Sequence, residues 1–113
     1  MFTTEKSAAR THLQGYVRAT LEQLTERFGH PEHYRFEKQS TNWTLEDAQG
    51  RVVTVYDWKE EQIPTGTHWW HIGGHTSEVV KSVAEATGLP TQTRDEYYAE
   101  LDRQVEEQEQ LLN

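Results

Sequence analysis

Hydrophobic residues recur at steps of three and four over the first part of the chain, as they do on one face of a helix. The series is Leu13, Tyr16, Val17, Thr20, Leu21, Leu24 and Phe28. Gly29 follows this series, and Pro31 comes just beyond it. Because glycine and proline end helices, the pattern predicts a first helix from about Lys6 to Phe28.

The segments after Pro31 are rich in aromatic and β-branched residues and are separated by turn formers, which is typical of strands. We predict strands over residues 34–38, 42–46, 51–58 and 67–72. Residues 47–50 are expected to form a tight turn, because Gly50 can adopt the positive φ that such turns need. Connections this short favour an antiparallel sheet.

Two further helices are predicted in the C-terminal part. The first begins near Thr76 or Ser77 and ends at Gly88, and the second begins at the capping-box sequence of residues 93–96. An apolar stripe with heptad spacing follows on that last helix, formed by Tyr98, Leu101, Val105, Gln108 and Leu112. Because two heptads are short for a coiled coil, we expect the stripe to pack on the protein's own body, with dimerisation as the alternative.

Together these elements predict an α+β fold with an N-terminal helix, an antiparallel sheet of about four strands and two C-terminal helices, packed as a two-layer sandwich. A chain of 113 residues fits one hydrophobic core. We assign residues 1–92 to an α+β core domain and residues 93–113 to an acidic C-terminal helix. That helix is part of the same domain or an oligomerisation element.

The formal net charge of −8 is distributed unevenly. Residues 95–113 hold seven acidic residues and one basic residue, so most of the acidity lies there. No basic stripe is visible, which argues against direct binding of nucleic-acid polymers. No apolar run approaches the roughly 20 residues that span a bilayer, and the N-terminus lacks a secretory signal. We therefore expect a cytoplasmic protein that does not enter membranes. There are no cysteines, so disulfides and thiolate chemistry are excluded.

Candidate chemistry is concentrated between Val52 and Ser77, which holds three of the four Trp, three of the six His and the single Gly-Gly pair. The Gly73-Gly74 pair precedes hydroxyl residues and a helical pattern. We therefore expect exposed backbone amides at a helix start, a place that suits an anion such as phosphate. A Trp ring on the open face of the sheet, near Arg51 and Lys59, would add a stacking platform and cations. The predicted ligand-binding residues are Trp58, Lys59, Trp69, His71, Gly73, Gly74, His75, Thr76 and Ser77.

Metal binding and catalysis are weaker interpretations. His68 and His71 lie three apart in a predicted strand and point to opposite faces, so they cannot share a metal without a bend. Asp57 with His71 or His75 offers an acid and a base, but nothing distinguishes it from a structural pair. We predict no metal, no cofactor and no catalysis. A metal-dependent hydrolase that uses Glu60 or Glu61 stays open as an alternative.

Four segments carry a resemblance to a known family. They are residues 28–31 (Phe-Gly-His-Pro), 43–45 (Trp-Thr-Leu), 53–59, which include Tyr-Asp-Trp-Lys, and 70–76, which include Trp-His-Ile-Gly-Gly-His. In these the chain resembles a family of small, mostly uncharacterised bacteriophage accessory proteins, over about residues 28–83. The resemblance implies a protein active in the cytoplasm of an infected bacterial host, where such proteins often block host defence.

Two functional hypotheses follow. In the first, a homo-oligomer binds a nucleotide second messenger, such as a cyclic oligonucleotide immune signal, and sequesters it without cleavage. In the second, the acidic helix after Thr93 inhibits a host defence protein by covering its basic, nucleic-acid-binding groove.

Overall fold

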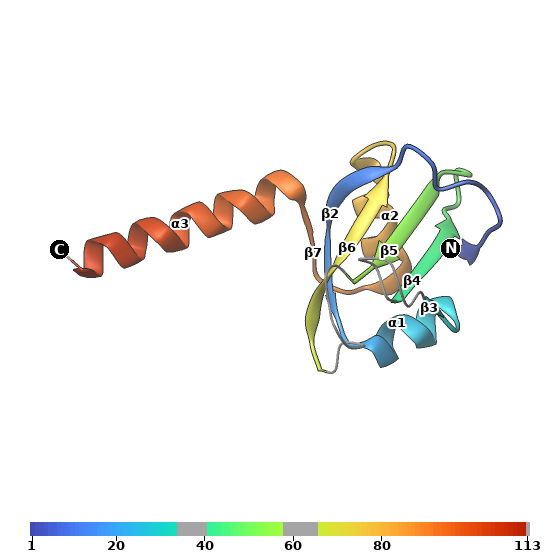
Figure 1. Ribbon diagram of the computed structural model, residues 1–113, viewed down its shortest axis with the longest axis horizontal. Helices are drawn as coiled ribbons and strands as arrows, with labels where there is room; N and C mark the ends of the chain where they lie inside the picture. Colours follow the sequence, from blue (N-terminus) through green and yellow to red (C-terminus); the bar gives the residue numbers. More distant parts are fainter. Residues whose placement is uncertain (34–40, 58–65, 113) are drawn as a thin grey trace.

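The computed structural model describes residues 1–33, 41–57 and 66–112, and within these the protein is an antiparallel sheet covered on one face by helices (Figure 1). The strands are β1 (Phe2–Thr3), β2 (His12–Ala19), β3 (Glu32–His33), β4 (Thr41–Glu46), β5 (Val52–Tyr56), β6 (His68–Gly74) and β7 (Thr91–Thr93). The helices are α1 (Leu21–Phe28), α2 (Glu78–Thr87) and α3 (Arg94–Leu112). The predicted α+β class is confirmed, and so is the antiparallel arrangement.

The sheet has the order β1-β4-β5-β6-β2-β7, and β3 pairs with β4. All pairs are antiparallel. The long strand β2 lies between β6 and β7, and its register against β6 shifts between Leu13 and Gly15. A Cβ at Gly15 would overlap the backbone oxygen of Gln92. Only glycine therefore lets β7 approach β2 so closely.

The prediction of one helix from Lys6 to Phe28 was wrong. The second half of that range is α1, but His12–Ala19 form β2 in the middle of the sheet. Thr20 separates the two elements as the N-cap of α1: its Oγ1 accepts a hydrogen bond from the amide of Gln23, and Gln23 Oε1 accepts one from the amide of Thr20. This capping box explains why α1 begins only at Leu21.

Several local predictions were correct. β4, β5 and β6 lie where strands were expected, and Gly50 has a φ of 80° in the turn between β4 and β5. Helix α2 ends at Gly88, whose left-handed backbone donates a hydrogen bond to Ala84 O at 2.8 Å. The strand predicted over residues 34–38 lies outside the described residues. The sheet has more strands than predicted, because β1, β2, β3 and β7 were not expected.

The hydrophobic core lies between the sheet and the helices α1 and α2. Alternate residues of the strands face it, among them Val17, Trp43, Val55 and Trp70, which are all buried. The helices contribute Leu24, Phe28, Val79, Val80 and Val83. The sheet and these two helices form the body of the protein. The opposite face of the sheet carries the start of α3 and the candidate site.

The expected packing of α3 as part of a two-layer sandwich was wrong. α3 contacts β2 and β7 near its start and then extends away from the body (Figure 1). From Leu101 to Leu111 every residue is exposed. No helix in the described ranges is long and apolar enough to cross a membrane.

Candidate functional site

A row of rings crosses the second face of the sheet, opposite the core. Tyr56, His71 and Tyr16 come from the adjacent strands β5, β6 and β2, and register places them side by side. The ring of His71 meets Tyr16 at 5.0 Å and Tyr56 at 5.3 Å between centroids, both edge to face. Such contacts stabilise aromatic pairs beyond their buried area. This row is a largely buried aromatic platform.

The platform holds the first turns of α3. The ring of Tyr97 lies on that of Tyr16 with 4.1 Å between centroids. Burial, together with the neighbouring Tyr98 hydroxyl, raises the pKa of Tyr16. The predicted capping box is confirmed: Thr93 Oγ1 accepts from the Glu96 amide at 3.2 Å, and Glu96 Oε1 accepts from the Thr93 amide at 3.1 Å. The start of α3 is thus fixed to the body.

A hollow of about 370 Å³ lies between this sheet face and α3. It is lined by Arg18, Trp69, Gln92, Tyr97, Glu100, Leu101 and Gln104. Arg18 and Trp69 are cross-strand partners of β2 and β6, and the ring of Trp69 meets Tyr97 at 6.4 Å. The hollow therefore combines a guanidinium, an aromatic surface and two side-chain amides with the carboxylate of Glu100, which is paired with Arg103. That set can bind a planar, anionic ligand.

His71 and Asp57 serve the framework of this site. Burial lowers the pKa of His71, and the charge of Asp57 opposes that shift only in part. The net shift favours the neutral form of His71. The carboxylate of Asp57 accepts a buried hydrogen bond from the amide of Thr41 at 2.9 Å, which ties the end of β5 to β4.

The diglycine lies inside β6 and is buried, in contrast to the expected set of exposed amides. Gly73 is paired with Leu13 on one side and with Thr54 on the other. A Cβ at Gly73 would overlap Thr54 Oγ1, and a Cβ at Gly74 would crowd Val79 of α2. Both glycines are explained by close packing within the body, so they offer no open anion cradle at the start of α2.

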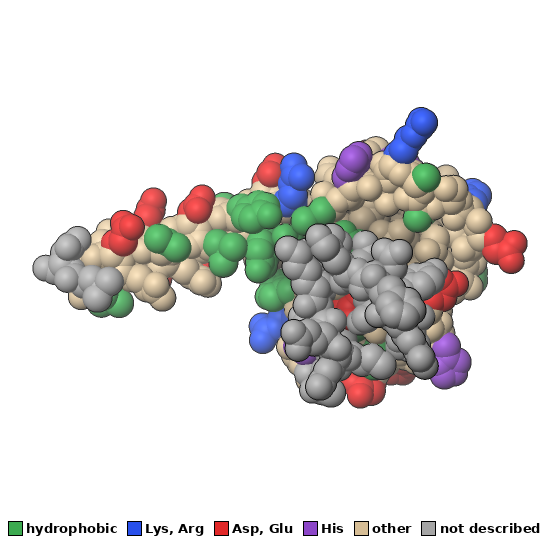
Figure 2. Space-filling model, viewed as in Figure 1, with side chains coloured by type: hydrophobic (Ala, Val, Ile, Leu, Met, Phe, Trp, Pro, Cys, Tyr) green, Lys and Arg blue, Asp and Glu red, His purple; other side chains and the backbone are tan. Residues whose placement is uncertain are grey.

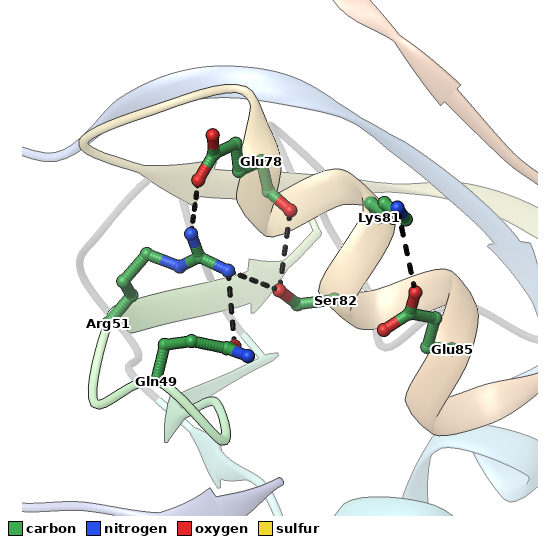
Figure 3. A pocket seen from close by; sticks show the side chains of 6 residues that line it. All are labelled: Gln49, Arg51, Glu78, Lys81, Ser82 and Glu85. Carbon is green, nitrogen blue, oxygen red and sulfur yellow. Dashed lines mark hydrogen bonds and ion pairs between the residues drawn. The ribbon is translucent and has the colours of Figure 1, made fainter.

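The guanidinium of Arg51 is already paired with two carboxylates. Its Nε donates to Asp47 Oδ2 at 2.7 Å. Its Nη1 pairs with Glu78 at the start of α2 (Figure 3). Ser82 Oγ donates to Asp47 Oδ2 at 2.9 Å. Arg51, Glu78 and Ser82 line a hollow of about 270 Å³ together with Gln49, Lys81 and Glu85. Because both carboxylates already neutralise Arg51, this hollow is a structural junction between the β4–β5 turn and α2, and it suits an anion poorly.

Beyond its first turns, α3 has exposed hydrophobic side chains and many carboxylates. Tyr98, Leu101, Val105 and Leu111 are 50%, 39%, 54% and 86% exposed. Figure 2 shows hydrophobic side chains along the face of α3 turned to the viewer, with acidic side chains along its upper edge. The helix holds seven acidic and two basic residues, so its net charge is −5.

The structure brings together only part of the predicted ligand-binding set. Trp69 and His71 share the second sheet face, and Trp69 reaches the hollow. His75, Thr76 and Ser77 are exposed in the connection to α2, away from the hollow's lining. Trp58 and Lys59 lie outside the described residues. Sequence reasoning missed Arg18, Gln92 and Tyr97. The residues of β2 had been assigned to the predicted first helix, and β7, with only three residues, is too short to give a strand pattern.

Comparison with protein-family models, with curated proteins and with solved structures found no match. Among the described residues, no group of three or more His, Asp or Glu side chains is arranged to hold a metal ion. What the site can bind therefore follows from its own geometry.

Proposed function

We propose that this protein acts by binding, and that α3 is its main binding element. In this proposal it is a bacteriophage accessory protein in the cytoplasm of the infected host. There, α3 covers a basic surface of a host protein, such as the nucleic-acid-binding groove of a defence enzyme. The observation that carries the proposal is the position of α3: a helix of net charge −5 is anchored at one end and exposed from Leu101 to Leu111.

Two physical arguments support a partner for this helix. A helix of this length gains most of its stability from packing, yet little of α3 packs on the body. Its carboxylates also create a negative field that accelerates association with a basic surface and weakens as salt screens it. An anchored, acidic helix therefore suits rapid, salt-sensitive binding to a positively charged protein.

Charge reversal on α3 tests the proposal. Glu106 and Glu107 are exposed and form no salt bridge within the described part of the chain, so Glu106→Lys with Glu107→Lys should leave the fold intact. We expect wild-type protein to retain one specific basic protein from a lysate of the natural host, and the double variant to lose most of it. The measurement is quantitative mass spectrometry of the retained proteins at low and high salt.

The matched control is Glu5→Lys with Glu26→Lys, which changes the net charge equally at exposed positions on the body. The control should retain the host protein as well as wild type does. Equal loss in both double variants would mean that net charge alone matters, and the role of α3 would be rejected.

A second function, nucleotide sequestration, is favoured by the hollow beside Trp69. Arg18 is exposed at its edge, and it pairs with no carboxylate among the described residues. A base stacked on Trp69 would place its phosphate near this guanidinium, within a hollow of nucleotide size. In this function the protein holds a nucleotide immune signal and releases it unchanged.

Thermal melting against mono-, di- and cyclic oligonucleotides tests this second function. A nucleotide that binds the folded state raises the melting temperature by mass action. We expect the rise in wild type and in Arg27→Gln, which removes an exposed cation from α1, and its loss in Arg18→Gln. A rise that survives Arg18→Gln, or no rise with any nucleotide, would exclude the hollow as the site.

A further inference from the structure

The exposed stripe on α3 has the spacing of a coiled-coil seam. In heptad notation Tyr98 and Val105 occupy a positions, and Leu101 and Gln108 occupy d positions. The side chain of Leu112 at the next a position lies outside the described residues. The stripe borders the helix face that lines the hollow, and the two share Leu101. α3 therefore has one face toward the body and an adjacent apolar face toward solvent.

The charges beside this stripe are arranged asymmetrically. The e positions hold Asp102 and Glu109, whereas the g positions hold Tyr97, Gln104 and Leu111. In a parallel pair of helices, each e residue faces a g residue of the other helix. Each carboxylate then faces a neutral side chain. In an antiparallel pair e faces e, which would bring Asp102 close to Glu109 of the other copy. Like charges at such contacts are destabilising.

We propose that the α3 stripe binds the α3 stripe of a second copy of this chain, in parallel. This inference rests on the proposed function in that α3 is again the binding element, and it assigns a separate partner to the apolar face. The b and c positions, which include Glu106 and Glu107, remain on the outside of the pair. Pairing therefore places the carboxylates of both copies on the outer surface of one helix pair. That surface would face the basic host protein.

The anchored start of α3 compensates for the short length of the apolar stripe. Two heptads are fewer than a free-standing coiled coil needs. Here, however, the capping box and the Tyr97–Tyr16 contact already fix the first turn, which removes part of the cost of helix nucleation. Val105 and Leu101 bury their exposed surface only when the second helix binds. Pairing should therefore be reversible and increase with protein concentration.

Single-cysteine variants test the pair, since the chain has no other cysteine. Gln108→Cys places a thiol at a d position, and Arg103→Cys places one at the outward f position; both residues are exposed. In a parallel pair, the two thiols introduced by Gln108→Cys meet across the seam, and mild oxidation with diamide links them. We expect covalent dimer at least fivefold faster for Gln108→Cys than for Arg103→Cys. Equal rates for the two variants would overturn the parallel pair.

Sedimentation velocity of the protein without added cysteines completes the test. Wild type should sediment faster as concentration rises, while Val105→Asp, altered at an exposed position, should stay monomeric with an unchanged circular dichroism spectrum. A wild type that is monomeric at every concentration would overturn the inference. Capture of the host protein by Val105→Asp would then show whether the proposed function holds without pairing.

Discussion

Replacing Trp70 with alanine is expected to lower the free energy of unfolding by about 3–5 kcal/mol, the range for large-to-small changes in a packed core. Trp70 is 1% exposed, and its ring meets that of Trp43 at 5.6 Å between centroids. Its Nε1 donates to Ala19 O at 3.0 Å, so the substitution also removes a buried hydrogen bond between β6 and β2. Urea denaturation followed by far-ultraviolet circular dichroism measures the loss.

The neighbouring Trp69 provides the control. It lies on the opposite face of β6, is only partly buried, and lines the hollow beside Tyr97. Trp69→Ala therefore removes less buried surface, and we expect less than half of the loss seen for Trp70→Ala. Equal losses for the two variants would contradict the assignment of Trp70 to the core and Trp69 to the second sheet face.

Replacing Asp47 with alanine is expected to cost about 2–4 kcal/mol, because this buried carboxylate organises the junction between the β4–β5 turn and α2. Its Oδ1 accepts from the amides of Gln49 and Arg51 at 3.0 and 2.9 Å, and its Oδ2 accepts from Arg51 Nε and Ser82 Oγ. The control is Glu78→Ala, which removes the exposed partner of Arg51 and should cost about 1 kcal/mol or less.

The effect of Asp47 depends on pH in a defined direction. Burial alone raises the pKa of the Asp47 carboxyl, but the hydrogen bonds from Arg51, Ser82 and the backbone outweigh it, and the pKa falls to about 2. Because the folded-state pKa is below the unfolded value of 3.8, the resulting stability is present above about pH 4 and is lost as pH falls toward 2. The difference between wild type and Asp47→Ala should shrink by about 1–2 kcal/mol over that window. A constant difference would show that the carboxylate's charge is unimportant.

The elements predicted correctly are those with strong local signals. Gly50 identifies the β4–β5 turn, Gly88 ends α2, and the Thr93–Glu96 capping box begins α3. Each signal acts within about four residues, so it survives whatever the rest of the chain does. Strand alternation also placed Trp69 and Trp70 on opposite faces.

The missed elements depend on contacts between distant segments. The residues of β2 fit a helical spacing, yet Gly15 is a weak helix former and the pairing with β6 stabilises the strand instead. The Thr20–Gln23 capping box was visible in the sequence and would have moved the helix start to Leu21. A site built from Arg18 and Tyr97 could not follow from local patterns, because strand register brings Arg18 to Trp69 and the packing of α3 on the sheet brings Tyr97 there.

The most direct test of α3 as the binding element is the affinity of the captured host protein for full-length wild type and for Glu106→Lys with Glu107→Lys, measured by calorimetry at two salt concentrations. The proposal predicts at least tenfold weaker binding by the variant at low salt. It also predicts that added salt weakens wild-type binding more than variant binding, because the variant has lost the charges that salt screens. Equal affinities of the two proteins at both salt concentrations would contradict it.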